Sequence, residues 1–73
     1  MERQEAIRAN QDTMNALARI SEEIGELDKL IFWFGQARYF NPTMVRRLSR
    51  TKARLLAEKE ALKAQRAYAQ QFI

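Results

Sequence analysis

The fold of this chain depends on one segment, Leu30-Ile31-Phe32-Trp33-Phe34-Gly35-Gln36-Ala37-Arg38-Tyr39-Phe40-Asn41-Pro42. It holds the only Trp, three of the four Phe and one of the two Tyr. The five bulky apolar residues at its start exceed what one helix face accommodates, because successive helical residues are rotated by about 100°. Asn41-Pro42 then interrupts the helical pattern. The sequence therefore predicts a first helix that ends here and a second helix that returns beside it.

A regular apolar pattern leads into this stretch. Large apolar side chains recur at alternating spacings of three and four residues: Leu17, Ile20, Ile24, Leu27, Ile31 and Phe34. This periodicity is typical of a helix that packs along a narrow seam. Proline disfavours a helical conformation in the residue that precedes it. We therefore expect the first helix to span residues 3–39.

The start of the second helix has its own local signals. Asn41 suits an N-cap, whose side chain accepts a hydrogen bond from the first turn, and Pro42 suits the first helical position. Phe40 is placed to pack on Val45 as a hydrophobic staple. These residues predict a turn at 40–41 and a second helix over residues 42–71. So short a connection places the two helices side by side and antiparallel.

The heptad spacing of the second helix sets a register. Folding the chain about Asn41 aligns three leucines with apolar residues of the first helix: Leu48 with Phe34, Leu55 with Leu27 and Leu62 with Ile20. The same register sets Arg54 beside Asp28 and Lys59 beside Glu23. We expect an all-α fold, a long antiparallel two-helix hairpin that forms a single domain over residues 1–73.

Half of the first helix's seam has no apolar counterpart in this register, since Ile31 faces Thr51, Ile24 faces Glu58 and Leu17 faces Gln65. Fully burying a Leu or Ile side chain is worth about 1.5–3 kcal/mol. The simplest way to cover the seam is a homodimeric four-helix bundle, and helices of another protein would serve as well. The predicted core and dimer seam comprises Leu17, Ile20, Ile24, Leu27, Ile31, Trp33, Phe34, Leu48, Leu55 and Leu62.

Composition argues against catalysis. The chain has no Cys and no His, which excludes disulfides, thiolate nucleophiles, imidazole bases and the usual zinc sites. Glu22, Glu23 and Glu26 lie three and four residues apart, the spacing of a solvated helix surface. Serine and threonine have no imidazole to activate them. We expect a non-enzymatic protein with no metal, no cofactor and no small-molecule substrate.

Charge is divided unevenly along the chain. The net charge of +4 is the sum of −2 over residues 1–41, with five Lys/Arg and seven Asp/Glu, and +6 over residues 42–73, with eight and two. This division has two interpretations. In the first, the two oppositely charged helices attract each other; in the second, the second helix presents a basic face to nucleic acid or to an acidic protein. No segment has the apolar length of a membrane span or the pattern of a signal peptide. We expect a cytoplasmic protein without membrane contact.

Aromatic and basic residues gather near the turn. Arg46, Arg47 and Arg50 have no acid opposite them in the predicted register, and Arg38 is close by. With Phe32, Tyr39 and Phe40 they form a mixture that is enriched at protein interfaces. The sequence predicts a small interaction module that binds itself and another protein, an inhibitor, anti-activator or adaptor of the type that phages and plasmids encode. The alternative is a basic hairpin dimer that binds RNA or DNA, because bases stack on aromatic rings and phosphates pair with arginine.

Overall fold

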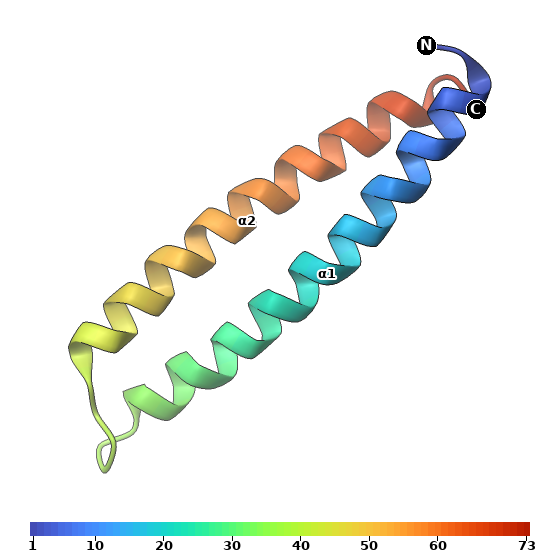
Figure 1. Ribbon diagram of the computed structural model, residues 1–73. Helices are drawn as coiled ribbons and strands as arrows, with labels where there is room; N and C mark the ends of the chain where they lie inside the picture. The colour runs from blue at the N-terminus through green and yellow to red at the C-terminus, as the bar shows by residue number, and fades with distance from the viewer.

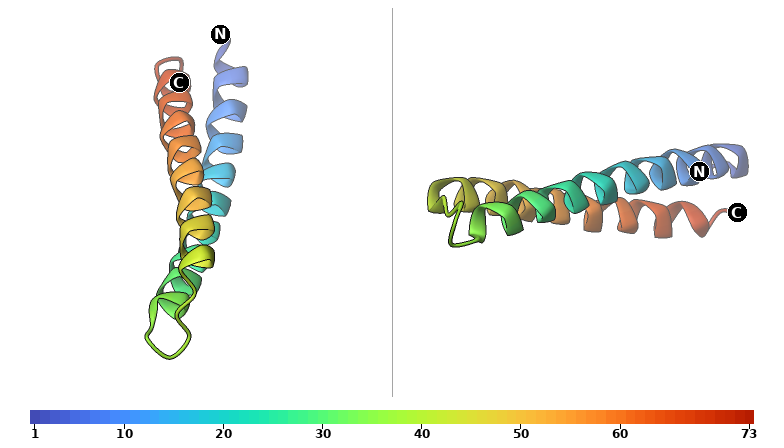
Figure 2. Two further views of the ribbon diagram at one scale, coloured as in Figure 1. Left: turned by 90° about the vertical axis from the view of Figure 1, so that its left-hand side faces the viewer. Right: turned by 90° about the horizontal axis from the view of Figure 1, so that it is seen from below.

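The protein is a two-helix hairpin. A computed structural model describes residues 1–73 and contains helix α1, Arg3–Gly35, and helix α2, Pro42–Gln70, with no strand. The helices run antiparallel and form a rod of 55 × 14 × 11 Å, with both termini at the end opposite the turn (Figure 1). Figure 2 shows that they cross at a shallow angle rather than lying parallel. The predicted all-α hairpin is confirmed.

Helix α2 begins where the local signals place it. The Asn41 side-chain oxygen accepts a hydrogen bond from the Met44 backbone N–H at 3.1 Å, and Pro42 occupies the first turn, where no intrahelical donor is needed. The helix ends at Gln70, one residue before the predicted end. The start of the helix is therefore fixed by chemistry within a few residues of the turn.

Helix α1 ends at Gly35 rather than at residue 39. Gln36 has an extended backbone, with φ −77° and ψ 143°, so residues 36–41 form the connection and the predicted turn at 40–41 was too short. The connection is closed by hydrogen bonds from the Asn41 N–H to the Phe34 carbonyl and from the Tyr39 N–H to the Gln36 carbonyl, each 3.0 Å. The prediction treated Pro42 as the terminator, but Gly35 comes first and is a poor helix former.

The longer connection also changes the register. Asp28 forms its ion pair with Lys52 and not with Arg54, and no ion pair joins Lys59 to Glu23. Farther along the rod, the Arg66 Nε–H donates a hydrogen bond to the Asn10 side-chain oxygen at 3.3 Å. These two contacts are centred on residues 40 and 38 instead of on Asn41, so the residues of α2 that meet α1 lie closer to the turn than predicted.

The core of the single chain is thin. Only Ala6, Thr13, Leu55 and Ala69 are buried, and no large side chain is fully buried. The Thr13 hydroxyl donates to the Ala9 carbonyl at 2.6 Å, which satisfies the one buried polar side chain. Leu55, 8% exposed, is the only large residue in this set. The remaining residues of the predicted seam, apart from Trp33, are half-buried.

Gly25 lies inside α1 with open space around it. A Cβ atom added there would meet nothing within 4 Å, and the backbone does not have a positive φ. We expect Gly25→Ala to stabilise the folded chain by about 0.5–1 kcal/mol, because alanine loses less backbone entropy in a helix. Thermal unfolding followed by circular dichroism measures the gain. An unchanged or lowered midpoint would mean that another helix approaches Gly25 closely in solution.

Candidate interaction surfaces

The turn end of the rod exposes aromatic rings. Phe32 and Phe40 are 70% and 62% exposed. Trp33 was predicted to lie in the seam, but it is 48% exposed and stacks on Tyr39, with ring centroids 4.5 Å apart and planes 15° apart. Because α1 ends early, the connection folds Tyr39 back onto the last turn of the helix. Phe34, in contrast, is half-buried on the interhelical side.

Arginines lie beside these rings. Thr43, Arg46, Arg47 and Arg50 line a hollow on the first turns of α2, and the Arg38 guanidinium carbon is 5.8 Å from the centre of the Tyr39 ring. No carboxylate is within ion-pair distance of any of these arginines; the three ion pairs of the protein lie elsewhere. We call this surface the tip. It comprises Phe32, Trp33, Arg38, Tyr39, Phe40, Arg46, Arg47 and Arg50.

The sides of the rod can be assigned from helical geometry. In each helix a central row at seven-residue spacing faces the other helix: Ala6, Thr13, Ile20, Leu27 and Phe34 in α1, and Leu48, Leu55, Leu62 and Ala69 in α2. Seen along the helix axis, a residue three positions after a member of this row points about 60° to one side of the row. A residue four positions after it points about 40° to the other side. The rod therefore has two distinct long faces.

The first face carries a groove with an apolar floor and an acidic rim. Its middle part is lined by Glu22, Glu23, Glu26, Leu27, Leu30, Thr51 and Leu55, with no cation among them. A second hollow near the open end is lined by Met1, Ala9, Thr13, Ala64, Gln65, Tyr68 and Ala69. Ala9 lies fourteen positions before Glu23 in α1, and Gln65 lies fourteen positions after Thr51 in α2. Fourteen residues are about four helical turns, so the two hollows share one face. Glu58, seven positions after Thr51, lies there too. We call this the carboxylate face.

The second face carries cations. The Asn10–Arg66 and Asp28–Lys52 contacts lie along it, and Lys59 is seven positions from both Lys52 and Arg66. Lys59 and Arg66 have no carboxylate partner within ion-pair distance. We call this the cation face.

The cation face also has an apolar part. Leu17, Ile24 and Ile31 follow Asn10 at seven-residue spacing and are half-buried beside the cations. The large apolar side chains exposed at its edges, one position after the central rows, are Ile7, Met14 and Leu56. The predicted neighbours of the seam, Thr51, Glu58 and Gln65, belong instead to the opposite face. Half of the six-residue apolar seam predicted for the first helix therefore lies along a row of lysine and arginine.

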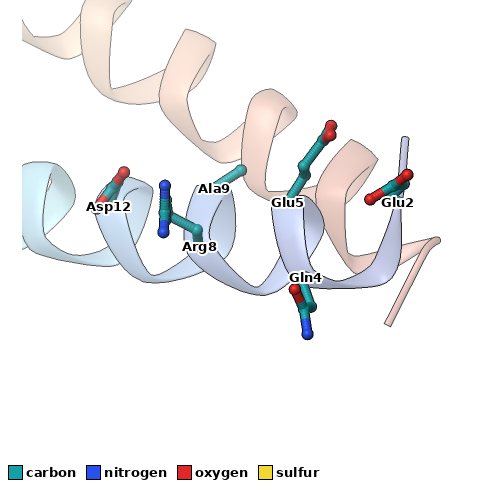
Figure 3. Close-up of a pocket in the computed structure, with 6 residues that line it drawn as sticks. All are labelled: Glu2, Gln4, Glu5, Arg8, Ala9 and Asp12. Carbon is teal, nitrogen blue, oxygen red and sulfur yellow. The ribbon is translucent and has the colours of Figure 1, made fainter.

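A further hollow at the start of α1 has mixed charge. It is lined by Glu2, Gln4, Glu5, Arg8, Ala9 and Asp12, and Figure 3 shows Gln4 and Glu5 projecting to opposite sides of the helix. No group of three or more Asp or Glu in the chain is arranged to hold a metal ion. Neither helix has the length and apolar character needed to cross a membrane.

Comparisons with protein-family models, with curated proteins and with solved structures gave no match. The surfaces themselves are therefore the basis for a functional proposal. The sequence had indicated the tip, apart from the stacking of Trp33 on Tyr39. It had not separated the two long faces, although the rows three and four positions after the central residues carry that information.

Proposed function

We propose that the chain is a non-enzymatic protein–protein interaction module. It associates with a second copy along its length and binds another protein through the tip. The observation that carries the proposal is the exposure of large apolar side chains on a folded chain whose own core contains a single large buried residue, Leu55. Such surface is typical of proteins whose interfaces are filled by a partner.

The energetics support association along the rod. A domain of this size rarely gains more than about 3–5 kcal/mol from its own core. The hairpin has neither a disulfide nor a metal site to add to that. Fully burying an exposed Leu or Ile side chain is worth about 1.5–3 kcal/mol. Leu17, Ile24 and Leu27 are half-buried, so covering them against a second molecule would add part of that value for each. Association is therefore the physical route to a stable fold.

The tip has the composition of a binding hot spot. Trp33 and Tyr39 form a stacked, half-exposed platform, and stacking restricts both rings before any partner arrives. The arginines around it have no internal carboxylate to compete with a partner. Tyr, Trp and Arg are the residues that most often dominate interface energetics. The tip is accordingly the surface we assign to docking on another protein.

A pull-down with a matched variant tests this assignment. The tagged protein and its Phe32→Ser/Phe40→Ser variant are compared for the proteins they retain from a lysate, each with and without nuclease. Both phenylalanines are exposed, so the variant should remain folded, which circular dichroism checks. A stoichiometric protein that survives nuclease and is lost with the variant supports the proposal. Equal retention by both forms would contradict the role of the tip.

The arginine hollow favours a second candidate, binding of RNA or DNA. Arg46, Arg47 and Arg50 are close together without carboxylate partners. If nucleic acid is the ligand, Arg46→Ala/Arg50→Ala should abolish binding and leave self-association unchanged. The logarithm of the binding constant should also fall linearly with the logarithm of salt concentration, because bound counterions are released. Fluorescence anisotropy with labelled RNA at several salt concentrations measures both effects. Binding to protein should depend more on Phe32 and Tyr39 and should survive moderate salt.

A further inference from the structure

The two long faces of the rod differ in how much charge α1 brings to them. On the cation face, two rows of α1 run through residues 7–31, one and four positions after the central residues. They hold eight residues, and only Asp28 among them is charged. The two rows of α1 on the carboxylate face, within residues 5–33, hold nine residues, of which five are charged, Arg19 included. Because charged residues are depleted at the centres of interfaces, the cation-face side of α1 is the better suited to be covered by a partner.

The same side of α1 is apolar and incompletely covered. Ile7 and Met14 are 47% and 40% exposed, and Leu17, Ile24 and Ile31 are half-buried. The rod is 55 Å long and 14 Å wide, so one long face offers roughly 770 Å², close to the about 800 Å² that each partner buries in a standard-size interface. The cation face therefore has both the apolar content and the area that a stable dimer needs.

Two symmetric contacts through this face are possible, and they differ in what the cations of α2 meet. If the turns of two copies lie at opposite ends, α2 of one copy runs along α2 of the other, and the row of Lys52, Lys59 and Arg66 meets the same row. If the turns lie at the same end, the two-fold axis runs along the rod and α2 of each copy lies over α1 of the other. The cations then meet the nearly uncharged side of α1. Opposed like charges are unfavourable at an interface, so the second contact is favoured.

A two-fold axis along the rod keeps every residue at its own height. Asp28 and Lys52 are in contact within the chain, so Lys52 of a second copy stands level with Asp28 and brings a second ammonium group to the one charge on this side of α1. Leu56 follows Lys52 by four residues and Ile24 precedes Asp28 by four, so Leu56 of the second copy lies level with Ile24. Leu56 is exposed in the single chain, and this contact covers it.

The tip arginines do not oppose this orientation. Arg46 and Arg47 come two positions and one position before Leu48 of the central row, and Arg50 comes two positions after it. All three side chains therefore point more than about 90° away from α1. They lie at the outer edges of the pair rather than between the two copies.

We propose that two copies of the chain pair symmetrically through their cation faces, with both turns at the same end. Leu17, Ile24 and Ile31 meet the same residues of the second copy along the two-fold axis. The lysines of each α2 cover the outer row of the other α1 with their aliphatic stems and keep their charged ends in water. The contact is closed, so association stops at the dimer.

This inference rests on the proposed self-association and adds its face and its orientation. Because both turns lie at the same end, the dimer presents two tips side by side. A partner that is itself two-fold symmetric, or that repeats its binding motif, can engage both tips at once, which raises the apparent affinity without any new contact.

Disulfide cross-linking tests the face and the orientation, because the chain has no cysteine of its own. Ile31→Cys is near the turn end of the proposed contact, and Ile7→Cys is near the open end. Leu30→Cys is the matched control, since Leu30 is the neighbour of Ile31 but lies on the carboxylate face. Each variant is oxidised alone, and Ile31→Cys is also mixed with a size-tagged Ile7→Cys. Circular dichroism confirms that each variant is helical.

A pair of leucines tests the same contact without oxidation. Leu56 and Leu30 are 42% and 44% exposed and lie on opposite faces. Leu56→Gln should weaken dimerisation by about tenfold or more, because each symmetric dimer loses the buried side chain twice. Leu30→Gln should leave it unchanged. Sedimentation velocity over a range of concentrations measures the dissociation constant of each variant.

The proposed dimer predicts a specific set of results. The mass of the unmodified chain should rise with concentration and stop at the dimer. Ile31→Cys should form a disulfide with itself, because the two copies of this residue meet at the axis within the reach of a disulfide. Leu30→Cys should not cross-link, and the mixture of Ile31→Cys with Ile7→Cys should give no mixed dimer.

Other outcomes overturn the proposal at different levels. A mixed dimer of Ile31→Cys with Ile7→Cys, without self-linking of Ile31→Cys, would show that the turns lie at opposite ends; self-association would stand and the orientation would be wrong. Cross-linking of Leu30→Cys, or weaker association of Leu30→Gln than of Leu56→Gln, would place the contact on the carboxylate face. A monomer at every concentration would contradict both this dimer and the proposed self-association, leaving only the tip as an interaction surface.

Discussion

Leu55→Ala should largely unfold the isolated hairpin. Leu55 is the only large residue that the single chain buries, at 8% exposure, and it lies in the central row of α2. Truncating a buried leucine costs about 2–5 kcal/mol, the transfer energy plus the cavity that remains. A domain of this size has roughly 3–5 kcal/mol of stability from its core, so little or none is left. Urea denaturation at low protein concentration measures the loss.

Leu56→Ala is the matched control for this change. The two leucines are neighbours, but Leu56 is exposed on the cation face. Removing its side chain should change the stability of the monomer by less than about 1 kcal/mol, because surface substitutions have small effects. The comparison needs dilute protein, since association stabilises the folded state. Equal losses for the two variants would mean that both leucines are buried in solution.

Ile24→Glu should abolish self-association. Ile24 is half-buried in the apolar part of the cation face, and a carboxylate there would lose its hydration where a second copy covers that surface. An unpaired buried charge costs several kcal/mol. We expect a monomer at concentrations where the unmodified chain associates, measured by sedimentation velocity with circular dichroism as the check on folding.

Ala57→Glu adds the same charge elsewhere and serves as the control. Ala57 is exposed and lies two positions after Leu55, on the side of α2 that faces away from α1. Its substitution should leave association intact. Undiminished association of Ile24→Glu would show that the apolar part of the cation face is not at the interface between copies.

Local sequence signals predicted the parts of the fold that depend on few residues. Asn41 and Pro42 fix the start of α2 because a side-chain cap and a missing N–H act within one turn. The end of α1 was wrong by four residues. Both Gly35 and Pro42 can end a helix. Which of them does so depends on whether the residues after Gly35 bury more surface by continuing the helix or by folding back onto it. In the structure α1 ends at Gly35 and Tyr39 folds back onto Trp33.

The tip was predictable in composition but not in arrangement. Its phenylalanines and arginines were expected at a binding surface, the arginines because no acid lies opposite them in the predicted register, and they are exposed there. Trp33 was assigned to the core and dimer seam. Trp33 is one position before Phe34 of the central row, so its side chain points away from α2. In the structure it is part of the exposed surface.

The all-α hairpin follows from the sequence alone, because a seven-residue apolar spacing, a near absence of helix breakers and one capped turn leave few other ways to bury the apolar seam. The register of the two helices and the chemistry of the two faces depend on how the helices pack. The ion pair between Asp28 and Lys52 depends on where the chain reverses, and a shift of two residues changes which side chains meet. Periodicity sets which side of a helix is buried; the length of the connection sets what that side faces.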